Sequence, residues 1–179
     1  MAESFVKSVT RAVGVVTSSS AGAVGVQTNL ITGITTTNVT VGDIVDNSNY
    51  IAGTKVSSIG VNSTTCDRDS TNTTAATSQT VKYLGLTTAY TSASGTKSII
   101  IGGTFANNTD SEVEITVHLY DNSASATPAI VSRVPVPNGS SFVLSDTGKT
   151  VLEGLDAIRV YCDSANGVDV QLGILKGVS

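Results

Sequence analysis

The chain has 179 residues, enough for one domain or two small ones with a buried core. Hydrophobic residues make up 40% of it, whereas 13% are charged, 4% are aromatic and none is Trp. The formal net charge is −4 and the 10 Lys and Arg residues are scattered singly, which argues against direct nucleic-acid binding because phosphate recognition uses clustered cations. No apolar run approaches the roughly 18 residues of a membrane helix, so no membrane contact is predicted.

Ser and Thr together exceed a quarter of the chain. Thr and Val favour half-buried pleated surfaces, whereas Gly, Asn, Asp and Ser favour turns, so the composition predicts an all-β protein. The first residues are basic and apolar like those of a signal peptide, but Glu3, Lys7 and Arg11 interrupt any continuous apolar segment. We therefore expect this segment to be retained in a chain made in the cytoplasm.

Residues 1–21 are predicted to form an N-terminal arm or a first strand. Phe5, Val9 and Val13 alternate with Lys7 and Arg11, although the same spacing also fits one face of a helix. The density of β-branched residues and the glycine that follows favour the extended form.

Residues 22–84 are predicted to form a small β-domain. Short strands in "TTTNVTVGDIVD" and "NYIAGTKVSSIG" are separated by turns, one of them at residues 42–43. The next 20 residues, 61–80, are polar without apolar periodicity and are predicted to be a long loop or an exposed hairpin.

Residues 85–179 have the most regular pattern. In "SEVEITVHLYD", apolar Val113, Ile115, Val117 and Leu119 alternate with polar residues, which is typical of a half-buried strand. "AIVSRVPVP" is predicted as a strand ended by its prolines, and residues 147–149 as a turn. Strands at roughly ten-residue intervals predict an antiparallel β-sandwich, either Ig-like or jelly-roll-like.

Few side chains suggest a catalytic or metal-binding site. His118 is the only histidine, and it is predicted to be a surface or interface residue because no further metal ligands accompany it. Cys66 and Cys162 match no metal-site spacing and are predicted to be reduced thiols, with a disulfide as the alternative.

The acidic residues are equally uninformative. "CDRDS", with Asp67 and Asp69 around Arg68, lacks the glycine and terminal Glu of a calcium loop, so we expect ordinary loop carboxylates. Glu112 and Glu114 share one strand face, which is typical of solvation rather than catalysis. We therefore predict no catalytic, cofactor-binding or metal-binding residue, no cofactor, and no enzymatic activity.

The second half of the chain resembles a family of small virion structural proteins of tailed phages, those of marine cyanobacterial phages above all. The family pattern combines a "P-x-G-x-x-x-x-I" entry strand, an "ANxT" turn, a "VTV-x-V" strand, a "VPxGSS" corner, a "K-x-VLExGD" turn and a closing "VDVxxSIL" strand. The matching residues are Gly95, Ile99–Ile101, Ala106–Thr109, Val113–Leu119, Val136–Ser141, Lys149–Asp156 and Val168–Leu175. The chain departs from the pattern at Ser92, where the family often has Pro, and at Leu155, where it has Gly. We also hypothesise that the small domain, 22–84, is inserted in the first loop of a second domain formed by 1–18 and 86–179, a layout implied by this resemblance rather than by the residues alone.

The first half has its own resemblance. "VTVGDIVDNSNYIAGTKVSSIG", residues 39–60, is similar to a "VxVGMxVxGxGIPAGTxVxSI" element of phage tail and fibre proteins. Together the resemblances imply a non-enzymatic virion protein, either a capsid decoration (cement) protein or a neck or tail accessory protein. The alternative is a receptor- or glycan-binding module of a tail fibre. The implied partners are the major capsid protein or neck and tail proteins and further copies of the chain, in a virion assembled in the host cytoplasm.

Overall fold

The computed structural model describes residues 3–144 and 149–178. These residues form antiparallel strands joined by turns, and no helix occurs among them, which confirms the predicted all-β class. None of the described segments is a helix suited to crossing a membrane. The predicted turn at 147–149 lies largely outside the described residues.

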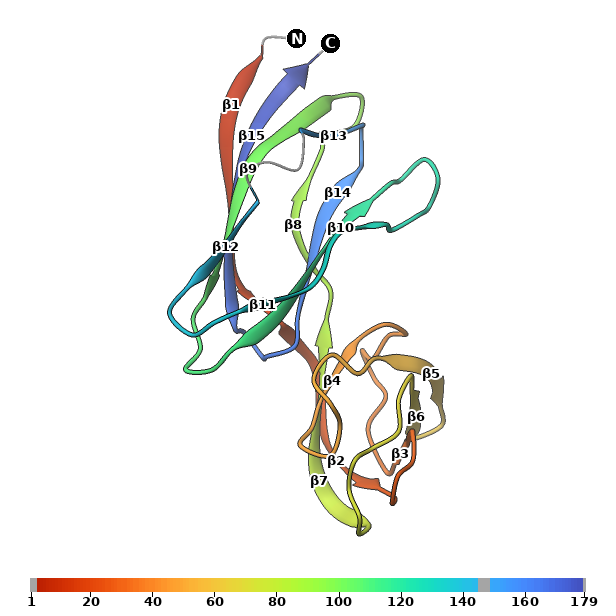
Figure 1. Cartoon of the computed structure of the whole chain (residues 1–179). Helices are drawn as coiled ribbons and strands as arrows, with labels where there is room; N and C mark the ends of the chain where they lie inside the picture. Colours follow the sequence, from red (N-terminus) through yellow and green to blue (C-terminus); the bar gives the residue numbers. More distant parts are fainter. Residues whose placement is uncertain (1–2, 145–148, 179) are drawn as a thin grey trace. The chain divides into compact units, whose positions relative to one another are not determined.

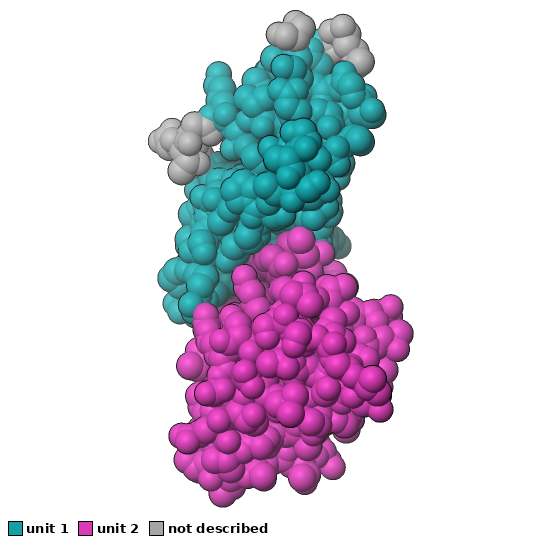
Figure 2. Space-filling view, turned by 90° about the vertical axis from the view of Figure 1, so that its right-hand side faces the viewer, with its two compact units in different colours: residues 1–13, 87–160, 167–179 teal, residues 14–86, 161–166 magenta. Residues whose placement is uncertain are grey.

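The chain divides into two compact units, shown in different colours in Figure 2. Unit 1 comprises residues 1–13, 87–160 and 167–179, and unit 2 comprises residues 14–86 and 161–166. The division falls at residues 13/14 and 86/87, where the expected limits were 21/22 and 84/85. It falls earlier at the first limit because a single ten-residue strand, Val15–Val24, runs across positions 21 and 22.

Unit 1 is a β-sandwich of two sheets (Figure 1). The first sheet has the order β1-β15-β9-β12, with β13 also paired to β9, and the second has the order β11-β10-β14-β8. The strands of the first sheet are β1 (Ser4–Val13), β9 (Lys97–Asn107), β12 (Ser141–Leu144), β13 (Thr150–Leu152) and β15 (Val168–Val178). Those of the second sheet are β8 (Thr87–Thr91), β10 (Val113–Tyr120), β11 (Ala129–Val136) and β14 (Ala157–Cys162).

The N-terminal segment is a strand rather than a helix. Residues 4–10 of β1 pair in continuous antiparallel register with β15. The register shifts before Val13, where Ala12 has a φ of 58° and donates its N–H to the Asp169 carboxylate at 2.9 Å. This bulge ends the regular edge of the sheet.

Strand β10 follows the predicted alternation with two corrections, the first of which is that Leu119, expected to face the core, is only half-buried. Val113, Ile115 and Val117 are buried, but Thr116, expected on the solvent face, is buried as well. The cause is a bulge in the partner strand β11, where Arg133 has a φ of 54° and donates its N–H to the Thr116 hydroxyl at 3.0 Å. The bulge places the Arg133 N–H, which needs a hydrogen-bond acceptor, beside the Thr116 hydroxyl, which accepts it.

Strand β11 spans Ala129–Val136 and ends directly before Pro137, in agreement with the predicted strand ended by its prolines. Pro135 lies within the strand, opposite Glu114. Strand β11 is at the edge of its sheet and pairs with a neighbouring strand, β10, on one side only. A proline, which has no N–H to donate, is therefore tolerated there.

Unit 2 contains a six-stranded sheet of order β4-β7-β2-β3-β6-β5. The strands are β2 (Val15–Val24), β3 (Leu30–Thr32), β4 (Ile44–Asp46), β5 (Val56–Gly60), β6 (Ser63–Cys66) and β7 (Ala76–Gly85). The two end strands also meet: the N–H of Val45 donates to the Thr54 carbonyl at 2.8 Å, and the N–H of Val56 donates to the Asp43 carbonyl at 2.9 Å. With the bridge between Ile44 and Lys55, these bonds close the sheet into a small barrel.

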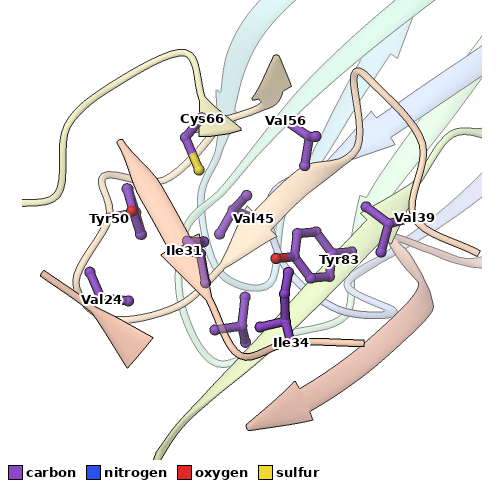
Figure 3. Close-up of a cluster of buried hydrophobic side chains, with 10 residues drawn as sticks. Val24, Ile31, Ile34, Val39, Val45, Tyr50, Val56, Cys66 and Tyr83 are labelled. Carbon is purple, nitrogen blue, oxygen red and sulfur yellow. The ribbon is translucent and has the colours of Figure 1, made fainter. Parts of the chain in front are cut away.

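The barrel interior is filled by aliphatic and aromatic side chains (Figure 3). The cluster consists of Val24, Ile31, Ile34, Val39, Val45, Tyr50, Val56, Cys66, Val81 and Tyr83. Its polar atoms have partners: the Tyr83 hydroxyl lies 2.8 Å from that of Thr64, and the Tyr50 hydroxyl donates to the Thr28 carbonyl at 3.0 Å. Burial of these hydroxyls is therefore compatible with a stable core.

The prediction of a long loop or exposed hairpin over residues 61–80 holds for residues 67–75, which contain no strand, and is wrong for the residues on either side of them. Strand β6 lies between β3 and β5, with Thr64 and Cys66 buried, and β7 begins at Ala76. The pattern was missed because the inward positions of β6 are a threonine and a cysteine rather than large aliphatic residues. Thr64 is buried at little cost because Tyr83 satisfies its hydroxyl.

Candidate interaction surface

The candidate site is the solvent-facing side of the first sheet of unit 1, which we call the outer face. Along β15, Val168, Val170, Leu172 and Ile174 are buried in the sandwich, so the residues between them point outward. The strand pairings carry this alternation to the neighbouring strands. The outer face comprises Phe5, Lys7, Val9, Arg11, Ile101, Gly102, Thr104, Val143, Val151, Asp169, Gln171 and Gly173.

Five large apolar side chains are exposed on this face. The Phe5 side chain is 78% exposed, and Val9, Ile101, Val143 and Val151 are each between 44% and 57% exposed. Its charged residues, Lys7, Arg11 and Asp169, lie on β1 and β15, and Arg11 approaches Asp169 at 3.8 Å. Exposed apolar side chains grouped on one face of a sheet mark a candidate protein-binding surface.

A shallow hollow of about 420 Å³ opens on the outer face. Gly102 and Gly173, which pair with each other across β9 and β15, line it together with Phe5 and Ile101. A methyl group on Gly102 would come no closer than 3.4 Å to another atom, and one on Gly173 no closer than 3.8 Å. Packing therefore does not demand glycine at these two positions, and the missing side chains leave room for an incoming group.

The solvent face of the second sheet is different, because its arginines contact neighbouring side chains of the same sheet. Arg133 binds Glu114 through two hydrogen bonds of 2.9 and 3.2 Å. The Arg159 guanidinium lies 3.7 Å from the centre of the Tyr120 ring, a cation–π contact. This sheet thus presents a more polar face than the outer face of the first.

The predicted residues of interest are dispersed, and the contacts that the structure gives them are structural. His118 is half-buried, with Nδ1 3.0 Å from the Thr127 carbonyl oxygen. Asp67 accepts the N–H of Lys55 at 2.8 Å, and Asp69 and Glu112 are exposed. No group of three or more His, Cys, Asp or Glu side chains placed to hold a metal occurs in residues 3–144 and 149–178.

The two cysteines are buried, and they are not joined in a disulfide. Cys66 lies in the barrel of unit 2, where burial raises the pKa of its thiol to about 11. Burial likewise raises the pKa of Tyr83 to about 12 and moves the pKa of Tyr50 upward. These shifts keep all three groups neutral at physiological pH, so Cys66 is poorly suited to act as a nucleophile.

The outer face itself was not predicted from the sequence. One signal was available: in the run "IIIGG", residues 99–103, consecutive isoleucines cannot all face the core of a strand. Ile100 is buried and Ile101 is exposed on the outer face. Comparisons with protein-family models, curated proteins and solved structures gave no match for the chain.

Proposed function

We propose that the chain is a non-enzymatic structural protein of a tailed-phage particle, either a capsid decoration protein or a neck or tail accessory protein. The observation that carries the proposal is the contrast between the apolar outer face and the more polar face of the other sheet. A protein that works by binding needs such a face and few reactive groups. Its partners would be the capsid protein or neck and tail proteins, and further copies of the chain, within the virion.

Two further observations support this function. The residues with potential chemistry, His118, Asp67, Glu114 and Cys66, have structural contacts in separate places. Leu155 has a φ of 74°, in the region that favours glycine, and glycine is the residue that the resembled phage family has at that position. The turn geometry thus agrees with the family pattern at a point where the sequence departs from it.

The alternative, a receptor- or glycan-binding module, has less support. Sugar recognition commonly uses exposed aromatic rings, but Tyr50 and Tyr83 are in the barrel core. Tyr120 is covered by Arg159. Phe5 is the one exposed aromatic residue among those that the structure describes, so no group of exposed rings forms a platform for a sugar there.

The proposal is tested with purified particles of the phage that encodes the chain. Mass spectrometry should find the chain in the particles, with hundreds of copies for a capsid decoration protein and about a dozen or fewer for a neck or tail protein. Purified chain should bind saturably to particles that lack it. Val143→Glu, which places a charge in the outer face, should lower this binding at least tenfold.

Thr88→Glu is the matched control, because Thr88 is exposed on β8 of the other sheet. It adds the same charge and should leave binding unchanged. Absence of the chain from purified particles would overturn the proposed function. Equal binding by wild type, Val143→Glu and Thr88→Glu would show that the outer face is not the binding surface.

A further inference from the structure

Strand β1 forms an edge of unit 1 that differs from the other edges. It is ten residues long, contains no proline, and has one neighbour in its sheet, β15 (Figure 1). Natural proteins usually protect edge strands with prolines, bulges, short lengths or a covering segment, because an open edge can pair with another chain. The regular part of β1, residues 4–10, has none of these four features, and of the charged side chains that also protect edges it carries only Lys7.

The remaining edges in the described part of unit 1 are protected. Edge β11 contains Pro135 and the bulge at Arg133. At the far side of the first sheet, β12 and β13 are only four and three residues long. Edge β8 has five residues, and the carbonyl of Ala89 within it accepts the hydroxyls of Ser8 and Thr10 at 2.8 and 3.2 Å.

We propose that β1 pairs in antiparallel fashion with β1 of a second copy of this chain. The two-fold axis that relates the two strands passes midway between their Ser8 residues, which lie opposite each other. The two first sheets then become one continuous sheet, and their outer faces lie side by side. The proposal goes beyond the proposed function and does not depend on it, because the pairing belongs to the purified protein in solution.

The charges on β1 select this register. Its outward residues are Phe5, Lys7, Val9 and Arg11 in alternation. With the axis at Ser8, Lys7 lies opposite the second copy's Val9, and Phe5 lies opposite its Arg11, so each cation meets an apolar residue. An arginine beside an exposed phenylalanine ring can also form a cation–π contact.

The neighbouring registers are less favourable. A two-fold axis at Lys7 would place the two Lys7 side chains directly opposite each other. An axis at Val9 would place Lys7 opposite Arg11 twice. Like charges directly opposite in a sheet are about 5 Å apart and destabilise the pair, and a shift by a single residue would turn outward side chains to the other face.

Cysteine cross-linking of the full-length protein tests both the pairing and its register. Lys7→Cys and Val9→Cys proteins are mixed under mild oxidation, and the products are separated by mass. Directly opposite residues in an antiparallel pair have Cα atoms about 4.5–5.5 Å apart, within the range that a disulfide spans. We expect a cross-linked dimer with one Lys7→Cys and one Val9→Cys chain, several-fold more abundant than either homodimer.

Wild-type protein is the control, since Cys66 and Cys162 are buried, and its sedimentation should show a dimer. Val9→Lys, which places lysine opposite Lys7, should raise the dissociation constant at least tenfold, whereas Val9→Glu should lower it. A monomer at all concentrations tested would overturn the proposal. Predominant cross-linking within Lys7→Cys alone or Val9→Cys alone, or equal effects of Val9→Lys and Val9→Glu, would overturn the register.

Discussion

Leu155 is a bulky residue in a backbone conformation that favours glycine. It has a φ of 74° in the turn between β13 and β14, where its N–H donates to the Ser92 carbonyl at 3.0 Å. A bulky side chain in this region strains the backbone by about 1–2 kcal/mol, whereas glycine adopts it freely. The side chain is 46% exposed, so it contributes little packing in return.

Leu155→Gly is therefore expected to raise the free energy of unfolding of unit 1 by about 0.5–1 kcal/mol, because relief of strain exceeds the added chain entropy. Urea denaturation followed by circular dichroism measures the change. The matched control is Val151→Gly in β13, at a similarly exposed strand position, which should lower the same free energy. A loss of stability in Leu155→Gly would mean that the turn is not strained.

Cys66 and Tyr83 make the barrel less stable at alkaline pH. Burial raises the pKa of Cys66 from 9.0 to about 11 and that of Tyr83 from 10.0 to about 12. The unfolded chain therefore loses these protons at a lower pH than the folded chain does. Their contribution to stability is fully present below about pH 9 and is lost as the pH rises towards 12.

Chemical denaturation at a series of pH values should show this decline in unit 2. Cys66→Val removes the thiol while keeping a small apolar side chain, and the decline that begins near pH 9 should become smaller in that variant. Identical pH profiles for wild type and Cys66→Val would indicate that the thiol does not contribute.

At the scale of elements, closure of the barrel depends on a few hydrogen bonds between the β4 and β5 segments. The amides of Gly42, Val45 and Val56 donate to carbonyls across this junction at 2.8–2.9 Å. Closure removes the open edges that both end strands would otherwise present.

These three amides should exchange with deuterium as slowly as those of the β2–β7 pair, because both belong to one closed structure. Amide exchange followed by NMR measures this directly. The Val41 and Asn62 amides, in turns, serve as fast-exchanging references. If the junction amides exchanged as quickly as the turn amides, unit 2 would be an open sheet.

At the scale of the whole molecule, residues 14–86 form the main continuous segment of unit 2. Val15 pairs with Gly85 at the base of the β2–β7 pair, so the two ends of residues 14–86 lie close together. A segment whose ends meet can be inserted into a loop of another domain without disturbing it.

Residues 14–86 produced alone are therefore expected to fold into the all-β barrel and to unfold cooperatively. The complementary protein, with a short glycine linker between Val13 and Thr87, should keep the β-sandwich. Circular dichroism and thermal denaturation measure both. An unfolded 14–86 fragment would show that its stability depends on the rest of the chain, beginning with residues 161–166, which cluster with it.

Particular residues show where the sequence was informative. The alternation from Val113 to Leu119 predicted β10, because burial on one face of a strand leaves a period of two in the sequence. Strand β6 was missed because its buried positions are Thr64 and Cys66, whose burial depends on the distant Tyr83 and the barrel core. The bulge that buries Thr116 was missed for the same kind of reason, since it lies in the neighbouring strand.

The sequence by itself determined the all-β class and the positions of most strands and turns, since strand periodicity and turn chemistry are local properties of the chain. It also indicated that few side chains could take part in catalysis or metal binding. Only the tertiary structure decided that β4 and β5 meet to close a barrel, and that Phe5, Ile101 and Val143 form one apolar face. These features depend on pairings between residues distant in sequence, and the residues on either side of such a pairing carry no local pattern that specifies the partner.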